Sequence, residues 1–376
     1  MIIESLELKN FRNYKDLQLS FDSRTNLLYG NNAQGKTNIL EALYVCAATK
    51  SHRCSRDREM IQFGEEAAHI KLAFLKAEIP YRIDIHLKRE GAKGIAVNGV
   101  AIRKASELFG ILNMVLFSPE DLSIIKNGPA DRRRFMDIEL CQLDRSYVHS
   151  LLNYNRALLQ RNRLLKEIGF SGELKETLDI WDAQLLRYGK ELIRHRKKFI
   201  RELNPVIQNI YSGITDAAEK IEIVYDGNIT EESYESALRK NREADIRQKT
   251  TSIGPHRDDI GFFLEKLRNS SKERVVLEKN GVDLRKFGSQ GQQRTAALSL
   301  KLSEIELMKK NTGEDPVLLL DDVLSELDTQ RQKQLLKSIS KIQTVITSTG
   351  MENLLEKDLQ INRRFRVTDG AVCTVD

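Results

Sequence analysis

The amino-acid sequence predicts an α/β fold with a long helical insertion. Segments with the apolar or alternating pattern of strands occur near both ends of the chain, within 1–127 and 251–376. The segment 128–250 between them is rich in Arg, Lys, Leu and Glu and has helical periodicity. A glycine-rich loop joins a predicted strand to a predicted helix in the first segment. We therefore expect the outer segments to build one α/β domain and the middle segment to form an inserted helical arm.

The composition excludes several classes of protein. The chain has 376 residues, of which 40% are hydrophobic and 30% charged, and this balance argues against a disordered chain. The longest apolar candidate, Ile39–Thr49, contains Glu41 and is too short for a membrane helix. The first residues alternate as a strand does and show no signal peptide, so we expect a cytoplasmic protein with no membrane segment. The net charge of +6 permits basic patches without proving that the protein binds nucleic acid.

The first predicted elements are strands around one helix. Ile2–Leu8 and Leu17–Phe21 alternate, and Asn10–Tyr14 between them is expected to turn the chain. Asn26–Tyr29 is a short apolar run that stops at Gly30, as a buried central strand does. Helical composition follows in 39–44, and further strand patterns occur at 68–74, 81–87 and 114–117.

The middle segment is predicted to be helical. An apolar and aromatic seam with alternating spacings of three and four residues runs from Leu178 to Phe199, and a second stripe runs from Leu143 to Leu158. A turn over 170–172 favours two antiparallel helices that form a short arm, with ordinary core-facing helices as the alternative. Pro205 is expected to break the helical region, and Ile221–Tyr225 alternates as a strand does.

The last segment returns to the α/β pattern. We expect strands at 260–264 and 274–277 around a polar loop, and a helix opened by a loop within 288–309. Two buried strands are predicted at 317–320 and 344–347. No internal repeat or low-complexity segment interrupts this order.

The glycine-rich loop fits a phosphate-binding motif in full. Gly30-Asn31-Asn32-Ala33-Gln34-Gly35-Lys36-Thr37 matches G-x-x-x-x-G-K-[ST], with an apolar strand before it and a helical segment after it. Glycine lets the backbone wrap a phosphate, while the N–H groups of the loop and of the helix N-terminus point at the anion. Lys36 is then expected to reach the β- and γ-phosphates of ATP, and Thr37 to offer its hydroxyl to Mg²⁺.

A P-loop predicts a carboxylate strand further along the chain. Val317-Leu318-Leu319-Leu320-Asp321-Asp322 has the required pattern. Asp321 is expected to hold Mg²⁺ directly or through water. Asp322 is expected to lie beside the attacking water, as a general base or as the group that positions it.

A second phosphate site is predicted about 30 residues before the acidic strand. Ser289-Gln290-Gly291-Gln292-Gln293 stands at the start of a predicted helix and offers hydroxyl and N–H donors there. One nucleotide cannot easily use both sites within one subunit. Ser325-Glu326-Leu327-Asp328 follows directly after the acidic strand.

This order of motifs resembles that of the ABC-type ATPases, and the Ser-Gln-Gly-Gln-Gln signature resembles their SMC-like repair branch. Four further segments carry a narrower resemblance: Leu8–Tyr14, Phe117–Leu122, Gly128–Phe135 and Gly254–Asp259. Through these segments the chain is similar to the RecF family within that branch. The resemblance covers nearly the whole chain. It implies a P-loop NTPase of the ABC ATPase-head type: a mixed or parallel sheet, an N-terminal antiparallel sheet lobe and an inserted helical arm.

The resemblance also implies roles for individual residues. Residues Gly30–Asn38 would bind ATP in one subunit, while Ser289, Gly291 and Gln292 would contact the γ-phosphate of ATP held by the other subunit of an ATP-dependent homodimer. Ser325–Asp328 would cross the dimer interface. Glu120 would take the place of the missing Q-loop glutamine near the metal. Val345–Thr349 contains no switch histidine, and Asp322 replaces the usual Glu, so the chain is expected to hydrolyse ATP slowly.

The family's partners are DNA and other repair proteins. The resemblance implies binding to double-stranded DNA and to ssDNA–dsDNA junctions at gaps. It further implies cooperation with RecR and RecO in loading a recombinase. The basic residues offered for DNA phosphates are Arg53, Arg56 and Arg58, the run Arg132-Arg133-Arg134, and the run Arg194, Arg196, Lys197 and Lys198. The alternative is a solvated charged face, and the scarcity of aromatic residues in these runs argues against base stacking as the main mode.

Two other functions compete with this one. The nucleotide-binding ATPase subunit of a membrane transporter also carries these motifs, but the form of the signature, the missing histidine and the helical arm argue against it. A P-loop kinase of a small metabolite would leave the signature unused. A group of charged residues lies at His256, Arg257, Asp258 and Asp259. It favours an ion-pair network or a contact near the nucleotide over a metal site.

Overall fold

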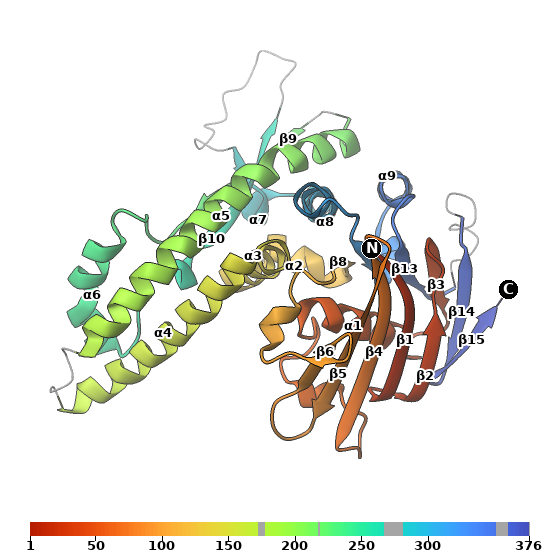
Figure 1. Cartoon of the computed structure of the whole chain (residues 1–376). Coiled ribbons are helices and arrows are strands. Elements are labelled where there is room, and N and C mark those ends of the chain that lie inside the picture. Colours follow the sequence, from red (N-terminus) through yellow and green to blue (C-terminus); the bar gives the residue numbers. More distant parts are fainter. Residues whose placement is uncertain (172–176, 217–218, 267–280, 351–359, 376) are drawn as a thin grey trace, which may run out of the picture. The chain divides into compact units, whose positions relative to one another are not determined.

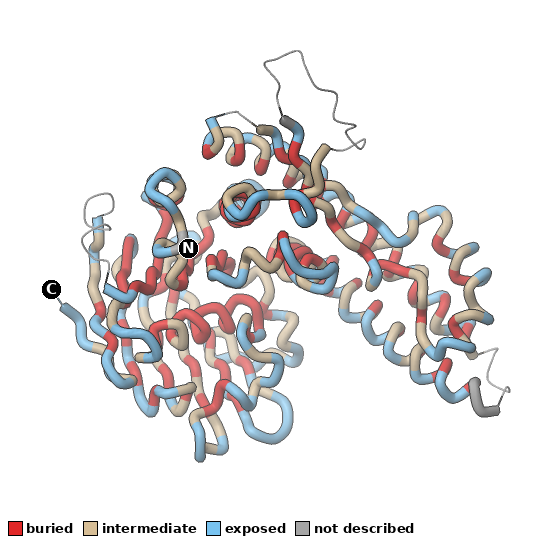
Figure 2. The backbone as a smooth tube through the Cα atoms, turned by 180° about the vertical axis from the view of Figure 1, so that it is seen from behind, coloured by how far each residue is buried: buried red, intermediate tan, exposed pale blue. Residues whose placement is uncertain are grey.

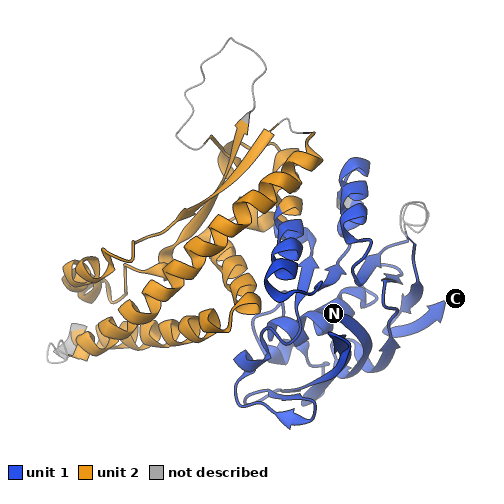
Figure 3. Cartoon of the chain, turned by 45° about the horizontal axis from the view of Figure 1, so that its top comes forward, with its two compact units in different colours: residues 1–121, 300–376 blue, residues 122–299 orange. Residues whose placement is uncertain are grey.

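The computed structural model describes residues 1–171, 177–216, 219–266, 281–350 and 360–375 (Figure 1). The chain packs as two compact units (Figure 3): Met1–Asp121 with Leu300–Asp376, and Leu122–Ser299. The second unit is longer than the predicted insertion 128–250, because the strand at Asp259–Lys266 pairs with the strand at Glu219–Asp226. The signature segment at Ser289 therefore lies in the second unit, whereas the P-loop lies in the first.

The first unit opens with an antiparallel sheet, as the resemblance implied. Its strand order is β2-β1-β4-β5-β6-β7. Alternation sets its register: Leu6 of β1 stands opposite Leu19 of β2 on one side and Leu72 of β4 on the other. The strands are β1 Ile2–Phe11, β2 Tyr14–Ser20, β4 Ala67–Lys76, β5 Ile79–Lys88, β6 Gly94–Val97 and β7 Val100–Ala101.

The second sheet of this unit is mixed and mostly parallel. Its order is β15-β14-β3-β13-β12-β8, and only β15 runs antiparallel to its neighbour. The predicted strands in it are confirmed: β3 Thr25–Tyr29, β8 Met114–Phe117, β12 Val317–Leu320 and β13 Thr344–Ser348. The remaining two, β14 Arg363–Thr368 and β15 Ala371–Val375, were not predicted.

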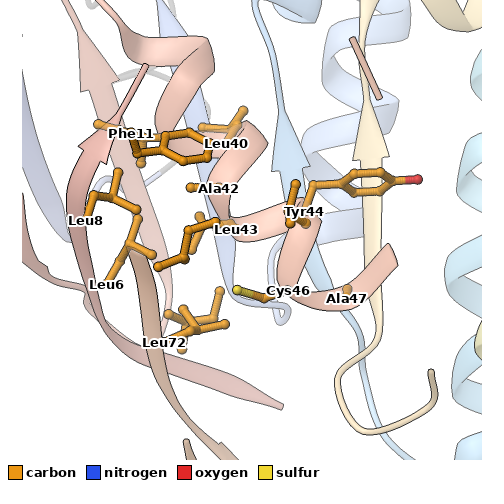
Figure 4. Packing of buried hydrophobic residues seen from close by; sticks show 14 of the residues in the cluster. Leu6, Leu8, Phe11, Leu40, Ala42, Leu43, Tyr44, Cys46, Ala47 and Leu72 are labelled. Carbon is orange, nitrogen blue, oxygen red and sulfur yellow. The ribbon is translucent and has the colours of Figure 1, made fainter. Parts of the chain in front are cut away.

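Helix α1, Lys36–Ala48, packs between these sheets. Eleven of its thirteen residues are buried, so it is apolar nearly all round rather than along one stripe. Its Leu40 and Leu43 lie near Leu6, Leu8 and Leu72 of the antiparallel sheet (Figure 4). The same cluster continues to Leu319 and Val345 of the mixed sheet. Figure 2 colours the backbone by burial and shows many buried residues in this unit. The P-loop that precedes α1 is thus anchored to both sheets.

The second unit contains the long helices. α4, Arg145–Ser171, packs against α5, Leu178–Ile214, and the two run in opposite directions (Figure 1). Leu178, Leu185 and Leu192 of the predicted seam are buried, so the antiparallel helix pair is confirmed. A three-stranded sheet of order β11-β10-β9 flanks α5. Its strands are β9 Glu219–Asp226, β10 Asp259–Lys266 and β11 Val282–Asp283, and the unit's other helices are α2 Leu122–Lys126, α3 Pro129–Leu143, α6 Tyr234–Gln248 and α7 Leu284–Phe287.

Three expectations differ from the structure or lie outside it. Pro205 does not break the helix, because α5 continues through it to Ile214. The predicted strand at 274–277 lies outside the described residues. Of the predicted turn at 170–172, the first two residues end α4 and the third lies outside the described residues. The remaining helical elements are α8 Gln290–Thr312, α9 Thr329–Ile339 and short 3₁₀ turns at Asp57–Met60, Ala105–Leu108, Pro119–Asp121, Pro255–Arg257 and Val323–Glu326.

Candidate functional site

The P-loop begins at a position that only glycine tolerates. Gly30 has φ of 150°, and a Cβ there would come 2.3 Å from the carbonyl oxygen of Val367 in β14. Gly35, also left-handed, is the N-cap of α1, and Asn31, Asn32 and Ala33 are exposed. The loop therefore leaves Asn31, Asn32 and Ala33 open to solvent, ahead of the buried first residue of α1.

Two neighbouring segments hold this loop in place. The Asn13 side chain donates a hydrogen bond to the Gln34 carbonyl (3.0 Å) and accepts one from Asn38 (2.8 Å). On the other side, the backbone N–H of Asp369 donates to the Gln34 side chain, and that of Gly370 donates to the Gln34 carbonyl. The β14–β15 hairpin therefore braces the P-loop, which sequence analysis missed.

Lys36 is buried and turns back onto its own loop. Its Nζ donates to the carbonyl oxygens of Gly30 (2.8 Å) and Asn31 (2.9 Å). Burial lowers the pKa of Lys36, and the carboxylates of Asp322 and Asp321 oppose that shift. The ammonium is thus held against the backbone of its own loop, and its contact with phosphate stays a prediction.

Thr37 and Asp321 are brought together from positions 284 residues apart. The Thr37 hydroxyl donates to Asp321 Oδ1 at 2.9 Å; Thr37 lies in the first turn of α1, and Asp321 directly follows β12. The Thr347 hydroxyl of β13 donates to the same Oδ1 at 2.9 Å. Burial raises the pKa of Asp321, and the two hydroxyl hydrogen bonds oppose the shift. The hydroxyl and carboxylate oxygens are the ligands that Mg²⁺ prefers, so these residues fit the expected metal.

Asp322 follows directly in a left-handed conformation. Its φ is 51°, and its N–H donates to the Thr347 hydroxyl at 2.8 Å. The Thr347 hydroxyl therefore orients both aspartates: it donates to the side chain of Asp321 and accepts from the backbone of Asp322. The sequence offered no motif for Thr347, and only the pairing of β13 with β12 reveals its role.

The signature segment forms a capping box at the start of α8. The Gln292 N–H donates to Ser289 Oγ (3.2 Å), and the Ser289 N–H donates to Gln292 Oε1 (2.9 Å). The remaining amide donor, Gln292 Nε2, points to Glu219 Oε1 at 2.7 Å. Glu219 also accepts from the Tyr211 hydroxyl (3.0 Å). A carboxylate thus already lies close to the helix N-terminus that was predicted to bind the γ-phosphate.

The other predicted site residues are at the surface. Glu120 is exposed in the 3₁₀ turn Pro119–Asp121, and it makes no hydrogen bond or ion pair within the part of the chain that the structure describes. Ser325 is exposed and donates to the Asp322 carbonyl (2.8 Å), so a hydrogen bond ties the start of the segment Ser325–Asp328 to the second aspartate. Their roles in a dimer stay predictions.

The basic residues divide into exposed and buried ones. Arg53 and Arg56 are exposed, as DNA contacts require. Arg132 is 1% exposed and forms a bidentate ion pair with Asp259 (2.5 and 2.9 Å), so its prediction as a DNA contact is wrong. Arg133 is half-buried and donates to the Asp258 carbonyl (2.7 Å). Arg196 is buried as well, between Asp137 and Asp258.

His256 belongs to a hydrogen-bonded network rather than to a metal site. Its Nδ1 lies 2.7 Å from the Tyr154 hydroxyl and its Nε2 lies 3.1 Å from the Thr251 carbonyl. Burial lowers the pKa of His256 to about 4. The ring is therefore neutral near pH 7. Within the described ranges, no three His, Cys, Asp or Glu side chains are grouped as metal ligands.

Comparison with known proteins gives the family. The model of the RecF/RecN/SMC N-terminal domain matches residues 2–371. The DNA replication and repair protein RecF of Agathobacter rectalis is 54% identical over 376 residues, which is 100% of both chains. This chain belongs to the RecF family. The RecF protein of Lachnoclostridium phytofermentans is 52% identical over 99% of each chain.

Solved structures agree with this membership of the RecF family. The structure of the recombination mediator protein RecF with ATP has a TM-score of 0.89 and 36% identity, and the match covers 100% of this chain and 98% of that one. An Smc head domain from Pyrococcus furiosus matches in fold, with a TM-score of 0.56 and 18% identity over 100% of this chain and 96% of that one. The predicted ATPase-head fold is therefore confirmed. Within the described segments, no helix is both long and apolar enough to cross a membrane.

Proposed function

We propose that this protein is an ATP-binding, slowly hydrolysing DNA repair protein that dimerises on ATP. The observation that carries the proposal is the 2.9 Å contact between Thr37 of the P-loop and Asp321 at the end of β12. This contact brings the P-loop hydroxyl and the carboxylate after β12 to one place, where both could hold the metal that ATP hydrolysis requires. Membership of the RecF family supports this reading over that of a transporter subunit or a small-molecule kinase.

The residues of the site have separate tasks. Lys36 exchanges its bonds to two loop carbonyls for bonds to the β- and γ-phosphates. Thr37 and Asp321 hold Mg²⁺, which neutralises charge on the phosphates when it is bound. Asp322, oriented through Thr347, positions the attacking water and accepts its proton. Ser289, Gly291 and Gln292 of a second subunit close the site around the γ-phosphate.

DNA binding is proposed for the exposed arginines of the first unit. Arg53 and Arg56 contact phosphates of duplex DNA and of ssDNA–dsDNA junctions, so affinity should fall steeply with salt and show little sequence preference. Action with RecR and RecO in recombinational gap repair, in the cytoplasm, follows the family. The name of the ATP-bound structural relative, a recombination mediator protein of the RecFOR pathway, supports this part.

Removal of the P-loop ammonium tests the proposal. Lys36→Ala should abolish tight ATP binding, measured by titration with a fluorescent ATP analogue, because no other cation is placed on the loop by the motif. Lys36→Arg should retain binding and lose hydrolysis, since a guanidinium is larger and planar. Lys50→Ala, an exposed lysine just beyond α1, is the matched control. Undiminished ATP binding by Lys36→Ala, in a folded protein, would contradict the site.

A further inference from the structure

Two leucine pairs recur in helix α4 of the second unit. They are Leu151-Leu152 and Leu158-Leu159. Neighbouring residues on a helix point about 100° apart, so both members of a pair cannot face the core equally. Leu151 and Leu158 are half-buried, whereas Leu152 is 49% exposed and Leu159 is 53% exposed. Their spacing places the two exposed leucines on the same side of the helix, about two turns apart.

The exposed leucines belong to a stripe that runs along the outer side of α4. The helix packs against α3, α5 and α6 (Figure 1), and the buried Tyr154, Arg161 and Leu165 mark its inner side. On the outer side, exposed side chains recur at spacings of three and four residues, as on one face of a helix. We call this stripe the α4 face, and its members are Arg145, His149, Leu152, Arg156, Leu159 and Arg163.

The arginines of the α4 face are not neutralised by neighbouring carboxylates. Within the part of the chain that the structure describes, Arg145, Arg156 and Arg163 make no ion pair. The sequence of α4 contains one acidic residue, Glu167, which lies beyond the end of the stripe and directly follows the exposed Lys166. These two neighbours offset each other's charge, so the three arginines leave the α4 face with an excess of positive charge.

Carboxylates close to the α4 face already have partners. Asp144, just before α4, accepts a hydrogen bond from the Ser146 hydroxyl (2.7 Å) and lies 3.2 Å from His195. On α5, Glu191 pairs with Arg194 at 2.8 Å. None of these carboxylates is left over to neutralise the arginines of α4.

Helix α5 borders the α4 face with an aromatic ring and a further cation. The Tyr188 ring lies 5.9 Å from the His149 ring, measured between centroids. The guanidinium carbon of Arg187 lies 5.4 Å from the centroid of the Tyr188 ring. Elsewhere on α5, Lys197 lies 3.8 Å from Glu231 and Lys198 lies 3.9 Å from a glutamate one turn away. The helix pair therefore has paired cations on one part of its surface and unpaired arginines beside exposed leucines on another.

We propose that the α4 face binds an acidic amphipathic helix of another protein. Leu152 and Leu159 lie at the centre of this interface, and the arginines pair with Asp or Glu side chains of the partner. A helix with apolar residues at seven-residue spacing can interleave them with the two leucines. A guanidinium forms two parallel hydrogen bonds with a carboxylate, and arginine is enriched in protein interfaces whereas lysine is depleted. The inference goes beyond the proposed function, since this contact needs neither ATP nor DNA.

The same features disfavour two other occupants of the α4 face. The backbone of duplex DNA would pair with the arginines, but it presents phosphates and sugars and would leave both leucines in water. The α4 face of a second copy would cover the leucines, but it would bring arginines against arginines, and like charges across an interface are unfavourable. An acidic amphipathic helix covers the leucines and neutralises the arginines together.

The test uses a synthetic peptide as the probe and the full chain as its receptor. The fluorescent peptide has about three heptads, with leucine at the a and d positions and glutamate at e and g. A second peptide has the same composition in scrambled order, and a DNA duplex is the third probe. Fluorescence anisotropy should show that the ordered peptide binds roughly ten-fold or more tightly than the scrambled one. Its helical circular dichroism should increase on binding.

Substitution of the leucines tests the centre of the interface. The double variant Leu152→Ala, Leu159→Ala should bind the ordered peptide roughly ten-fold or more weakly than the parent does, because both apolar anchors are lost. Alanine is the best helix former, so α4 should persist, and thermal unfolding checks this. Val100→Ala, at an exposed apolar residue of β7, is the matched control and should bind the peptide as the parent does.

Substitution of the central arginine tests the charge. Arg156→Gln should weaken binding of the ordered peptide by roughly three- to ten-fold and make its affinity less sensitive to salt. Lys198→Gln, an exposed cation of α5 that already has a partner, is the control. Equal binding of the two peptides, no binding of either, or unchanged binding by the double variant would overturn the docking site. An Arg156→Gln protein that loses affinity for the duplex but not for the peptide would assign the α4 face to DNA and refute the proposal, while the proposed ATP site would stand.

Discussion

The side chain of His256 shows how one half-buried residue makes the second unit sensitive to acid. It is held between the Tyr154 hydroxyl and the Thr251 carbonyl, and burial lowers its pKa to about 4. Arg257 and Arg133 add to the lowering, while Asp245 opposes it. In the unfolded chain the same ring has an ordinary pKa near 6.5. The folded state therefore disfavours the proton.

The sign of the pH effect follows from these two pKa values. Stability is fully present above pH 6.5 and is lost as the pH falls toward 4, because the unfolded chain binds the proton first. Between pH 7 and pH 5 the free energy of unfolding should fall by about 2 kcal/mol on account of this ring. Urea unfolding followed by circular dichroism at both pH values measures the loss.

The contribution of His256 is isolated by substitution. His256→Gln keeps a polar side chain but cannot titrate, so its loss of stability between pH 7 and pH 5 should be smaller than the parent's by that amount. His149→Gln is the control, because His149 lies on α4, the helix that carries Tyr154, but is exposed. Its stability should depend on pH as the parent's does. Equal pH dependence in His256→Gln and the parent would show that the ring does not carry the effect.

At the scale of elements, alternation and motif context were sufficient for most strands and for α1. The β14–β15 hairpin was missed although its pattern was visible, since Phe365 and Val367 alternate with arginines before an Asp369-Gly370 turn. Pro205 misled in the opposite direction. It lies on the exposed face of α5, and buried Leu203 and Ile207 on either side hold the helix, so packing outweighs the missing hydrogen bond.

The start of α8 yields a prediction at the same scale. Glu219 places a carboxylate beside Gln292 at a helix N-terminus, where the γ-phosphate of a partner's ATP is proposed to bind. Glu219→Gln keeps a hydrogen-bond acceptor for Gln292 and removes the charge that repels the phosphate. We expect the ATP-dependent dimer to form at roughly three- to ten-fold lower protein concentration. Sedimentation velocity over a concentration series measures this.

Glu222→Gln supplies the matched control for that prediction. Glu222 is exposed on the same strand, β9, and should leave the dimerisation curve unchanged when it is neutralised. A Glu219→Gln protein that dimerises less readily than the parent would show that the carboxylate orients Gln292 instead of opposing the phosphate.

At the scale of the whole molecule, motifs predicted the family and the ATPase-head fold, but not every contact. The sequence could place Lys36, Thr37 and Asp321, because each has a fixed position in a motif. It could not place Thr347, which acts through strand pairing. It also misassigned Arg132, because a run of three arginines does not reveal which one faces Asp259 inside the fold. Which arginine of the run is buried and which is exposed depends on the packing of the fold and cannot be read from composition.

The proposed dimer gives the last prediction. Ser289 is exposed and its hydroxyl proton is available to a phosphate, since Ser289 Oγ accepts from Gln292 in the capping box. Ser289→Arg should leave ATP binding to the monomer nearly intact, because Lys36 is untouched. Its bulk should block the composite site, and with it dimerisation and hydrolysis. Ser289→Ala removes the cap without the bulk, and it should dimerise more weakly than the parent but better than Ser289→Arg.

Asp322→Asn should have the opposite effect on the same dimer. Asparagine tolerates the left-handed backbone that Asp322 adopts, with φ of 51°, so the turn and its bond to Thr347 should persist. Without a carboxylate to accept a proton from the attacking water, hydrolysis should stop while ATP stays bound. The variant should therefore accumulate as an ATP-bound dimer, whereas the parent should return to monomer as ATP is consumed. Sedimentation velocity with ATP, repeated after phosphate release has ended in the parent, distinguishes the two. A Ser289→Arg protein that dimerises and hydrolyses ATP at the parent's rate would refute the composite site.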